Sequence, residues 1–249
     1  MGYPVYIFFG LLPSVIWLLF YLRKDSHPES NRMVIKIFLW GVLITIPAAL
    51  VEIGIFSFLV NPFSQWIETS SFLFLLIYNI FAISLVEEIS KYLVVREKIV
   101  KDPAFDEPVD AMIYMIIAAL GFAALENLLI LAPFGKSFLF GETLKIVLLR
   151  FIGATFLHAL ASGIIGFFLA LSFYYSYKRI RLYLTGFGLA VSLHAVYNLS
   201  IIKIVENDKY IIVPVIALAL SAVFVSFGFK KLKKIKSICK TKKSWTNLS

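Results

Sequence analysis

The sequence predicts an all-α membrane protein, a polytopic membrane helix bundle of about seven transmembrane helices. Of its 249 residues, 60% are hydrophobic, whereas soluble domains contain about 45–50%. The mean hydropathy of the chain is +0.89. The apolar residues are also gathered in runs of about 20, which is the length of helix that crosses a bilayer.

These runs define the spans and the organisation of the chain. The first run lacks a basic stretch before it, so we expect a span and not a cleavable signal peptide. The fifth is too long for one straight crossing, so we expect it to tilt, protrude or break near Gly163 and Gly166. Residues 1–229 then form one membrane domain, and 230–249 form a basic tail. We place the spans at about 3–22, 34–60, 71–95, 109–132, 143–177, 182–203 and 210–229.

Basic residues alternate between the two sides of the predicted bundle. Of the 24 Lys and Arg residues, 18 lie in the tail and in the loops after the first, third and fifth spans. Cytoplasmic loops are enriched in these residues, so we expect a multi-pass protein of the cell membrane with its N-terminus outside and its C-terminus in the cytoplasm. The tail either contacts anionic lipid or serves only to set the topology.

The composition excludes several other classes of protein. The net charge is +9, but its alternation along the chain indicates topology and contact with the lipid bilayer, so we expect no nucleic-acid partner. The single cysteine, Cys239, lies in the basic tail. A disulfide framework and a cysteine-rich zinc site are therefore excluded.

Two adjacent carboxylates, Glu87 and Glu88, lie near the end of the third span. A charge inside a bilayer costs about 2.5–3.5 kcal/mol on insertion scales, so a pair of them needs a reason. Lys91 shares a helix face with Glu87, and the two form an ion pair that either joins helices or serves chemistry. Glu88 points about 100° away, so we expect it to need a metal, a histidine or a proton. A desolvated carboxylate of this kind can act as a general base.

Three later spans add further polar groups. They are Glu126 and Asn127 in the fourth span, His158 in the fifth, and His194 with Asn198 in the sixth. Each alone is more often a hydrogen-bonded packing residue than a ligand. Carboxylates, imidazoles and an amide at membrane depth are together typical of an intramembrane hydrolase.

The depths of these groups set an expectation about distance. At about 1.5 Å of rise per residue, Glu87 lies about 13 Å and Glu126 about 25 Å from the cytoplasmic ends of their spans. Straight helices would keep the two apart, and tilt would be needed to join them. Small residues around Gly121 predict close helix packing there. We expect Glu52 and Arg150 to pair across helices as structural residues.

The ordered motifs resemble those of the PrsW family of intramembrane proteases. This family is similar to the wider superfamily of CAAX prenyl endopeptidases and bacteriocin-processing proteins. The resemblance covers about residues 70–200, and its specificity comes from the ordered set and not from any one motif. The matching motifs are Glu87-Glu88-x-x-Lys91, Phe122-x-x-x-Glu126-Asn127, His158 with its following glycines, and His194-x-x-x-Asn198.

The resemblance implies hydrolysis of a peptide bond of a membrane-anchored protein within or near the bilayer. The best-known member of the family is a site-1 protease that cleaves a membrane-anchored anti-sigma factor. By position, Glu87 or Glu88 is implied as the catalytic group that activates water. Lys91 and Asn198 are implied as further catalytic residues. Glu126 and His158 are implied as metal ligands or water-positioning groups, and His194 and Asn198 as metal ligands or donors to the oxyanion. Zinc accepts such ligands, but a metal-free glutamate mechanism stays open.

Two other functions fit parts of the pattern. A proton-coupled transporter also needs intramembrane Glu, Lys and His, but transporters often show repeated halves, which this chain lacks. A non-catalytic membrane scaffold or adaptor would keep the same polar cluster for specific helix packing. The protease is the function that the sequence favours.

Overall fold

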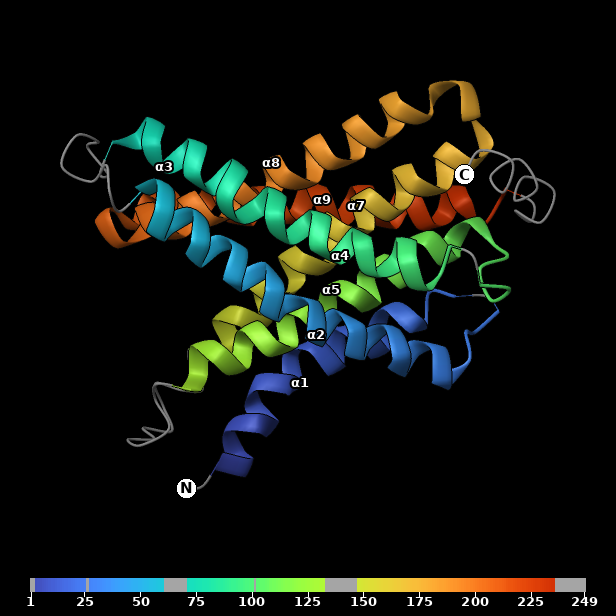
Figure 1. Ribbon diagram of the computed structural model, residues 1–249, viewed down its shortest axis with the longest axis horizontal. Coiled ribbons are helices and arrows are strands. Elements are labelled where there is room, and N and C mark those ends of the chain that lie inside the picture. The colour runs from blue at the N-terminus through green and yellow to red at the C-terminus, as the bar shows by residue number, and fades with distance from the viewer. Residues whose placement is uncertain (1–2, 26, 61–70, 101, 133–146, 236–249) are drawn as a thin grey trace.

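The computed structural model describes residues 3–25, 27–60, 71–100, 102–132 and 147–235, and over these residues the regular structure is entirely helical (Figure 1). Short π-helical segments, η1 (Phe56–Val60) and η3 (Asn79–Ser84), extend or join helices, as do the 3₁₀ segments η5 (Ser176–Lys178) and η6 (Asp208–Ile211). The α-helices are α1 (Tyr3–Leu22), α2 (Asn31–Ile55), α3 (Phe72–Tyr78), α4 (Leu85–Lys98), α5 (Pro108–Leu131), α7 (Ala154–Tyr174), α8 (Arg179–Glu206) and α9 (Ile212–Leu232).

The predicted spans are confirmed as helical segments of the bundle. Six of them are long and apolar enough to cross a membrane, and a shorter apolar helix, Ile7–Leu22, precedes these six. The chain is therefore a multi-pass membrane protein. The six are Asn31–Phe58, Phe72–Lys98, Pro108–Leu131, Val147–Tyr174, Ser176–Ile204 and Asp208–Leu232.

The connections between helices gather at two opposite ends of the bundle. The α1–α2, α4–α5 and α7–α8 connections and the end of α9 lie at one end, on the right in Figure 1. These are the basic loops of the sequence, so the charge alternation corresponds to a real separation in space. Most of the basic tail, residues 236–249, lies outside the described residues.

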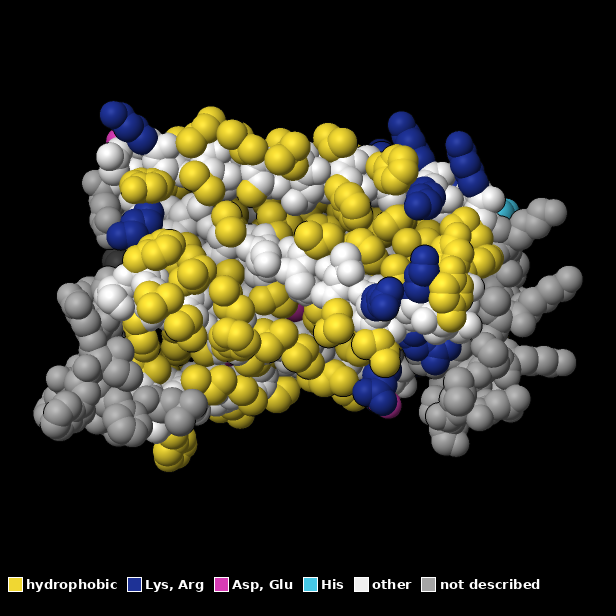
Figure 2. Space-filling model, turned by 90° about the horizontal axis from the view of Figure 1, so that it is seen from above, with side chains coloured by type: hydrophobic (Ala, Val, Ile, Leu, Met, Phe, Trp, Pro, Cys, Tyr) yellow, Lys and Arg dark blue, Asp and Glu magenta, His cyan; other side chains and the backbone are white. Residues whose placement is uncertain are grey.

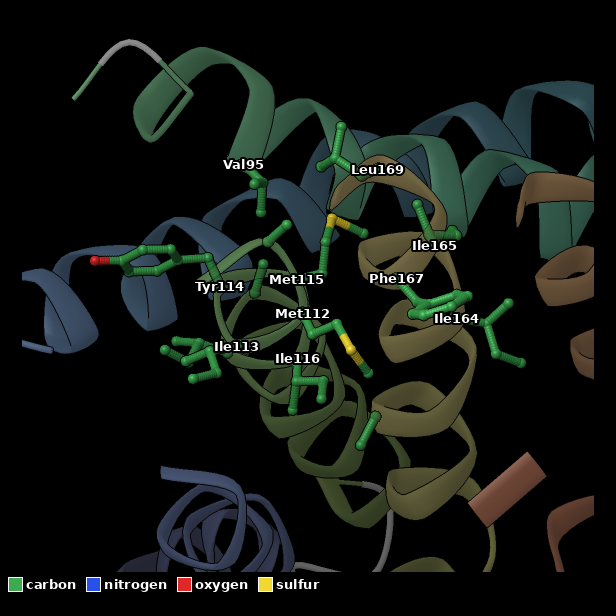
Figure 3. Packing of buried hydrophobic residues seen from close by; sticks show 14 of the residues in the cluster. Val95, Met112, Ile113, Tyr114, Met115, Ile116, Ile164, Ile165, Phe167 and Leu169 are labelled. Carbon is green, nitrogen blue, oxygen red and sulfur yellow. The ribbon is translucent and has the colours of Figure 1, made fainter. Parts of the chain in front are cut away.

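The centre of the bundle is α5, which is mostly apolar and is buried on all sides over most of its length. Every residue from Pro108 to Ala124 is buried, and the helix packs against α1, α2 and α7. Figure 3 shows Met112 of α5 beside Phe167 of α7. A helix without a polar face is stable only inside a bundle, so α5 fixes the positions of its neighbours.

The outer helices expose large apolar side chains in place of polar ones. Phe58, Leu184, Leu220 and Val223 are among the most exposed. Figure 2 shows this apolar surface on one face, with Lys and Arg gathered near both ends. An apolar surface of this extent fits the hydrocarbon of a bilayer and not water.

Glycines allow α2 and α5 to approach backbone to backbone. A Cβ atom added to Gly121 would lie 2.1 Å from the carbonyl oxygen of Phe38, and one added to Gly41 would lie 2.2 Å from that of Ala118. Neither position tolerates a side chain unless the backbone moves. The close packing predicted around Gly121 is confirmed.

The long fifth span is interrupted, but not where we expected. The turn lies at Gly153, between a helical segment at 147–152 and α7. The expectation of a break near Gly163 or Gly166 is wrong, because both lie inside the continuous helix α7. Their small size serves packing instead: a Cβ atom on Gly166 would lie 2.6 Å from the carbonyl oxygen of Ala111 in α5.

Candidate active site

Four membrane-crossing segments bring the predicted polar residues together in the interior. The π-helical segment η3 ends three residues before the first of them, and such segments are rare and often found at functional sites. All of the side chains named here except Glu126, which is partly exposed, are buried. Glu87, Glu88 and Lys91 come from α4, Glu126 from α5, His158 from α7 and His194 from α8.

The side chain of Lys91 lies at the centre of this group and has no exposed surface. Its Nζ atom is 3.0 Å from Glu87 Oε2, 2.8 Å from Glu88 Oε1 and 2.7 Å from His158 Nδ1. An ammonium has three protons to donate and no acceptor. Its three contacts therefore match its full hydrogen-bonding capacity.

The predicted Glu87–Lys91 pair is confirmed, and Glu88, which we expected to need a metal, a histidine or a proton, contacts both Lys91 and a histidine. Glu88, which is three residues before Lys91, also reaches it and is itself completely buried. Glu88 also lies 3.0 Å from His194 Nδ1 and accepts a hydrogen bond from Ser162 Oγ at 3.2 Å. Three side chains therefore hold the Glu88 carboxylate: Lys91, His194 and Ser162. Lys91 reaches both glutamates because its side chain is long.

His158 links Glu126 to the rest of the group. Its Nε2 atom is 2.7 Å from Glu126 Oε2, and its Nδ1 atom faces Lys91 and lies 3.6 Å from Glu87 Oε2. The expected separation of Glu126 from Glu87 is therefore bridged by an imidazole ring. No direct contact between the two carboxylates is needed.

Arg150 contacts Glu126 and not Glu52, contrary to our expectation of a Glu52–Arg150 pair. Its Nη2 atom is 3.1 Å from Glu126 Oε1, and its Nε donates a hydrogen bond to Asn127 Oδ1. Asn127 in turn donates to Thr155 Oγ1 at 3.1 Å. A guanidinium beside Glu126 balances the charge of this carboxylate inside the bundle.

The aromatic ring of Phe122 covers one side of the polar group. The Phe122 ring lies 4.5 Å from Lys91 Nζ, within the range of a cation–π contact. It also lies 5.9 Å from the His158 ring, and the His158 and His194 rings meet edge to face at 5.1 Å. These contacts limit the rotation of both imidazoles.

Asn198 lies one helical turn beyond His194 on α8 and is half-buried. Among the residues that the structure describes, its amide has no hydrogen-bond partner, in contrast to His194. The shared helix face of the two is as predicted, and the Asn198 amide remains available to a bound molecule.

One subset of the group can hold a metal ion. Glu87, Glu88, His158 and His194 each offer a ligand atom, and these atoms all lie within 4.8 Å of one another. Two carboxylates and two imidazoles suit zinc chemically. Glu126 lies outside this subset, and its contact with the far nitrogen of His158 is the contact that commonly orients a metal-bound histidine.

Sequence reasoning missed Ser162 and predicted the wrong partner for Arg150. Ser162 follows His158 by four residues, so the helical period could have placed it on the same face. No helical spacing could have placed Arg150, because the turn at Gly153 separates it from α7.

A helical bundle with a buried ionisable centre defines the class to which this chain belongs, that of polytopic membrane proteins with an intramembrane site. Residues 29–227 match the family described as PrsW family intramembrane metalloprotease. The chain belongs to this family, which confirms the resemblance noted in the sequence.

Curated relatives support the same assignment. The chain is 30% identical over 193 residues to Protease PrsW of Geobacillus kaustophilus, with 76% of each chain covered. It is 30% identical over 210 residues to Protease PrsW of Oceanobacillus iheyensis, covering 84% of this chain and 88% of that one. It is 26% identical over 232 residues to Protease PrsW of Bacillus subtilis, covering 92% and 94%. No solved structure matches the chain significantly.

Proposed function

We propose that this protein hydrolyses a peptide bond of a membrane-anchored protein within or near the bilayer, in a site-1 type of regulatory cleavage. The observation that carries the proposal is the buried convergence of Glu87, Glu88, His158 and His194 around Lys91. A structural ion pair needs two partners. This group instead brings two carboxylates and two imidazoles together around one lysine, and its family is one of proteases.

Of the two adjacent carboxylates, we assign Glu87 as the group that activates water. Glu88 is held by Lys91, His194 and Ser162 and has no exposed surface. Glu87 has one short contact, to Lys91, and its residue retains 6% exposure. A general base must reach a water molecule and the substrate, and Glu87 has the greater freedom to do so.

The hydrolysis then follows from the positions of these groups. Glu87 takes a proton from water as the water oxygen attacks the carbonyl carbon of the scissile bond. The carbonyl oxygen becomes an oxyanion, which the Asn198 amide stabilises by donating a hydrogen bond. The bond between carbon and nitrogen breaks, and Glu87 returns its proton to the leaving amine.

The chemistry of the donor set also suits a zinc ion, consistent with the family description, and the ion would displace Lys91 Nζ from Glu88 Oε1 and His158 Nδ1. Glu88, His158 and His194 would hold it, and Glu126 would orient His158. When bound, zinc supplies a Lewis acid and brings the ionisation of a bound water near pH 7. The metal-free alternative uses the same residues, with Lys91 as the cation that neutralises the two glutamates.

The substrate class and orientation belong to the same proposal. A site inside a helix bundle, with an apolar outer surface, suits a protein substrate that is itself anchored in the membrane. The basic connections gathered at one end favour a cytoplasmic position for that end, because cytoplasmic loops are enriched in Lys and Arg. The N-terminus is then outside, and the C-terminus is cytoplasmic.

The experiment is cleavage by the purified protein in lipid vesicles, with single-span peptides as substrates and ¹⁸O-labelled water as solvent. Hydrolysis predicts a new carboxyl terminus that contains one ¹⁸O atom. The matched control is Glu97→Gln, an exposed carboxylate on the same helix as Glu87 and Glu88, and it should retain cleavage. Binding of peptides without any cleavage would instead indicate a membrane adaptor.

A further inference from the structure

A groove in the surface lies between α1, α7 and α9, and no residue of the polar group lines it. It has a cavity volume of about 580 Å³, and its walls include Trp17, Phe156 and Phe229. The Trp17 ring stacks on Phe156 with centroids 4.2 Å apart. Its Nε1 donates a hydrogen bond to the carbonyl oxygen of Phe151 at 2.8 Å. The indole is therefore held in place, and the groove is a formed feature.

One end of this groove is basic. Lys24 lies just after the end of α1, and Lys230 and Lys233 lie at the end of α9, and all three are exposed and line the groove. Both helices end on the side of the bundle that carries the basic connections (Figure 1). Within the described part of the chain, none of the three has a carboxylate partner, and the Lys24 ammonium lies over the Phe20 ring, 4.7 Å from its centroid.

We propose that this groove binds one anionic phospholipid. Its acyl chain would lie against Trp17, Phe156 and Phe229, and its phosphate would contact the three lysines. The walls are formed by apolar segments of the bundle, so an acyl chain suits them, and basic pockets between transmembrane helices bind anionic head groups. Trp17 precedes Lys24 by seven residues, about 10 Å along the helix. That separation is suited to a molecule with a charged head and an apolar chain.

A second groove on the bundle serves as an internal comparison. It has a volume of about 390 Å³ and lies between α7, α8 and α9, with Ile164, Leu193 and Phe224 among its lining residues. No charged residue lines it. It can accept an acyl chain but has no means to select a head group.

The test uses Trp17 as the reporter, in a variant with the substitutions Trp40→Phe, Trp66→Phe and Trp245→Phe. The protein is placed in phosphatidylcholine vesicles that contain a small fraction of lipid brominated on its acyl chains, which quenches tryptophan on contact. Quenching of Trp17 should show that brominated phosphatidylglycerol is enriched at the groove about fivefold or more over brominated phosphatidylcholine. A fivefold enrichment corresponds to about 1 kcal/mol, which is the contribution of one basic residue.

Two triple variants distinguish binding by the groove from attraction by the overall positive charge at that end of the bundle. Lys24→Gln with Lys230→Gln and Lys233→Gln should abolish the preference for the anionic lipid. The matched control, Arg32→Gln with Lys36→Gln and Lys178→Gln, removes the same charge at the same end outside the groove and should retain it.

Several results would overturn the proposal. Equal quenching by both lipids would show that the groove does not select a head group. Loss of the preference on adding millimolar inorganic phosphate would show that the lysines bind free anions. Weak quenching by both lipids would show that a second copy of the chain covers the groove. Native mass spectrometry of the wild-type protein gives an independent readout, in which phosphatidylglycerol should be retained and phosphatidylcholine lost.

Discussion

Lys91 is the residue on which the order of the polar group depends. It is the only group with short contacts to Glu87, Glu88 and His158 at once among the described residues. A buried charge is tolerated when it is paired and fully hydrogen-bonded. Lys91 meets this condition for itself and supplies it to both carboxylates.

Lys91→Ala should therefore destabilise the protein strongly. Removal of one partner from a buried ion pair costs about 3–5 kcal/mol, because the remaining charges are left unpaired. For a protein of this size we expect the unfolding midpoint to fall by about 10 °C or more. Thermal unfolding in detergent measures this change.

Arg96→Ala is the matched control, because Arg96 lies on the same helix and its ion pair with Glu97 is exposed. Such pairs contribute about 0–1 kcal/mol. A Lys91→Ala protein as stable as Arg96→Ala would show that the buried contacts of Lys91 do not hold the group together.

Substitutions can distinguish the proposed metal ligands from Glu126, which supports one of them. We expect purified protein to retain about one equivalent of zinc, and His194→Ala to retain none. Glu126→Gln should still bind zinc but with affinity about 10–100-fold weaker, since it contacts only the far nitrogen of His158. Metal analysis and zinc titration measure both effects.

Cleavage by protein shown to be free of metal would contradict the zinc assignment. It would move the mechanism to the glutamate alternative, with the histidines as hydrogen-bonding groups.

At the residue scale, helical spacing predicts part of the site. The contact of Glu87 with Lys91 follows from a separation of four residues, and the shared face of His194 and Asn198 follows in the same way. The contact of Lys91 with His158 spans 67 positions, and only the packing of α4 against α7 creates it. Spacing on one helix carries no information about such contacts.

At the scale of helices, the α2–α5 contact is set by backbone approach at Gly121. Gly121→Ala should destabilise the bundle by about 1–3 kcal/mol, since its new methyl group would meet a carbonyl oxygen that cannot rotate away. The comparison is Gly188→Ala on α8, where nothing lies within 4 Å of the added atom. That substitution should be neutral or stabilise by up to about 1 kcal/mol.

Thermal unfolding of the two variants side by side checks this prediction. Equal stability would mean that the close approach of α2 and α5 is not needed for the bundle.

The spans themselves could be predicted from hydropathy, because the bilayer demands an apolar run of a given length. The turn at Gly153 could not, since glycines in membrane helices serve packing as often as they serve breaks. Only the neighbours of each glycine distinguish the two cases. Gly153 faces the Tyr197 hydroxyl and the carbonyl oxygen of Leu149, whereas Gly166 faces the backbone of α5.

At the scale of the whole molecule, the basic connections at one end predict its orientation in the membrane. A reporter that is active only outside the cytoplasm should be silent when fused after Ser249, and active when fused before Met1. The same pair of fusions with a cytoplasmic reporter should give the reverse result. An active external reporter at the C-terminus would contradict the proposed orientation.

The central claim is that an ionisable carboxylate at Glu87 performs hydrolysis inside this bundle. The most direct measurement is the rate of peptide cleavage by Glu87→Gln in vesicles, beside Glu88→Gln and the control Glu97→Gln. Glu97 is on the same helix with 61% of its side chain exposed. An amide packs like the acid but cannot accept the proton of water. We expect Glu87→Gln to accumulate normally in the membrane and to cleave at least about 100-fold more slowly, while Glu97→Gln cleaves at the wild-type rate. Cleavage by Glu87→Gln at the wild-type rate would contradict this claim, and wild-type cleavage by both Glu87→Gln and Glu88→Gln would contradict the protease function as well.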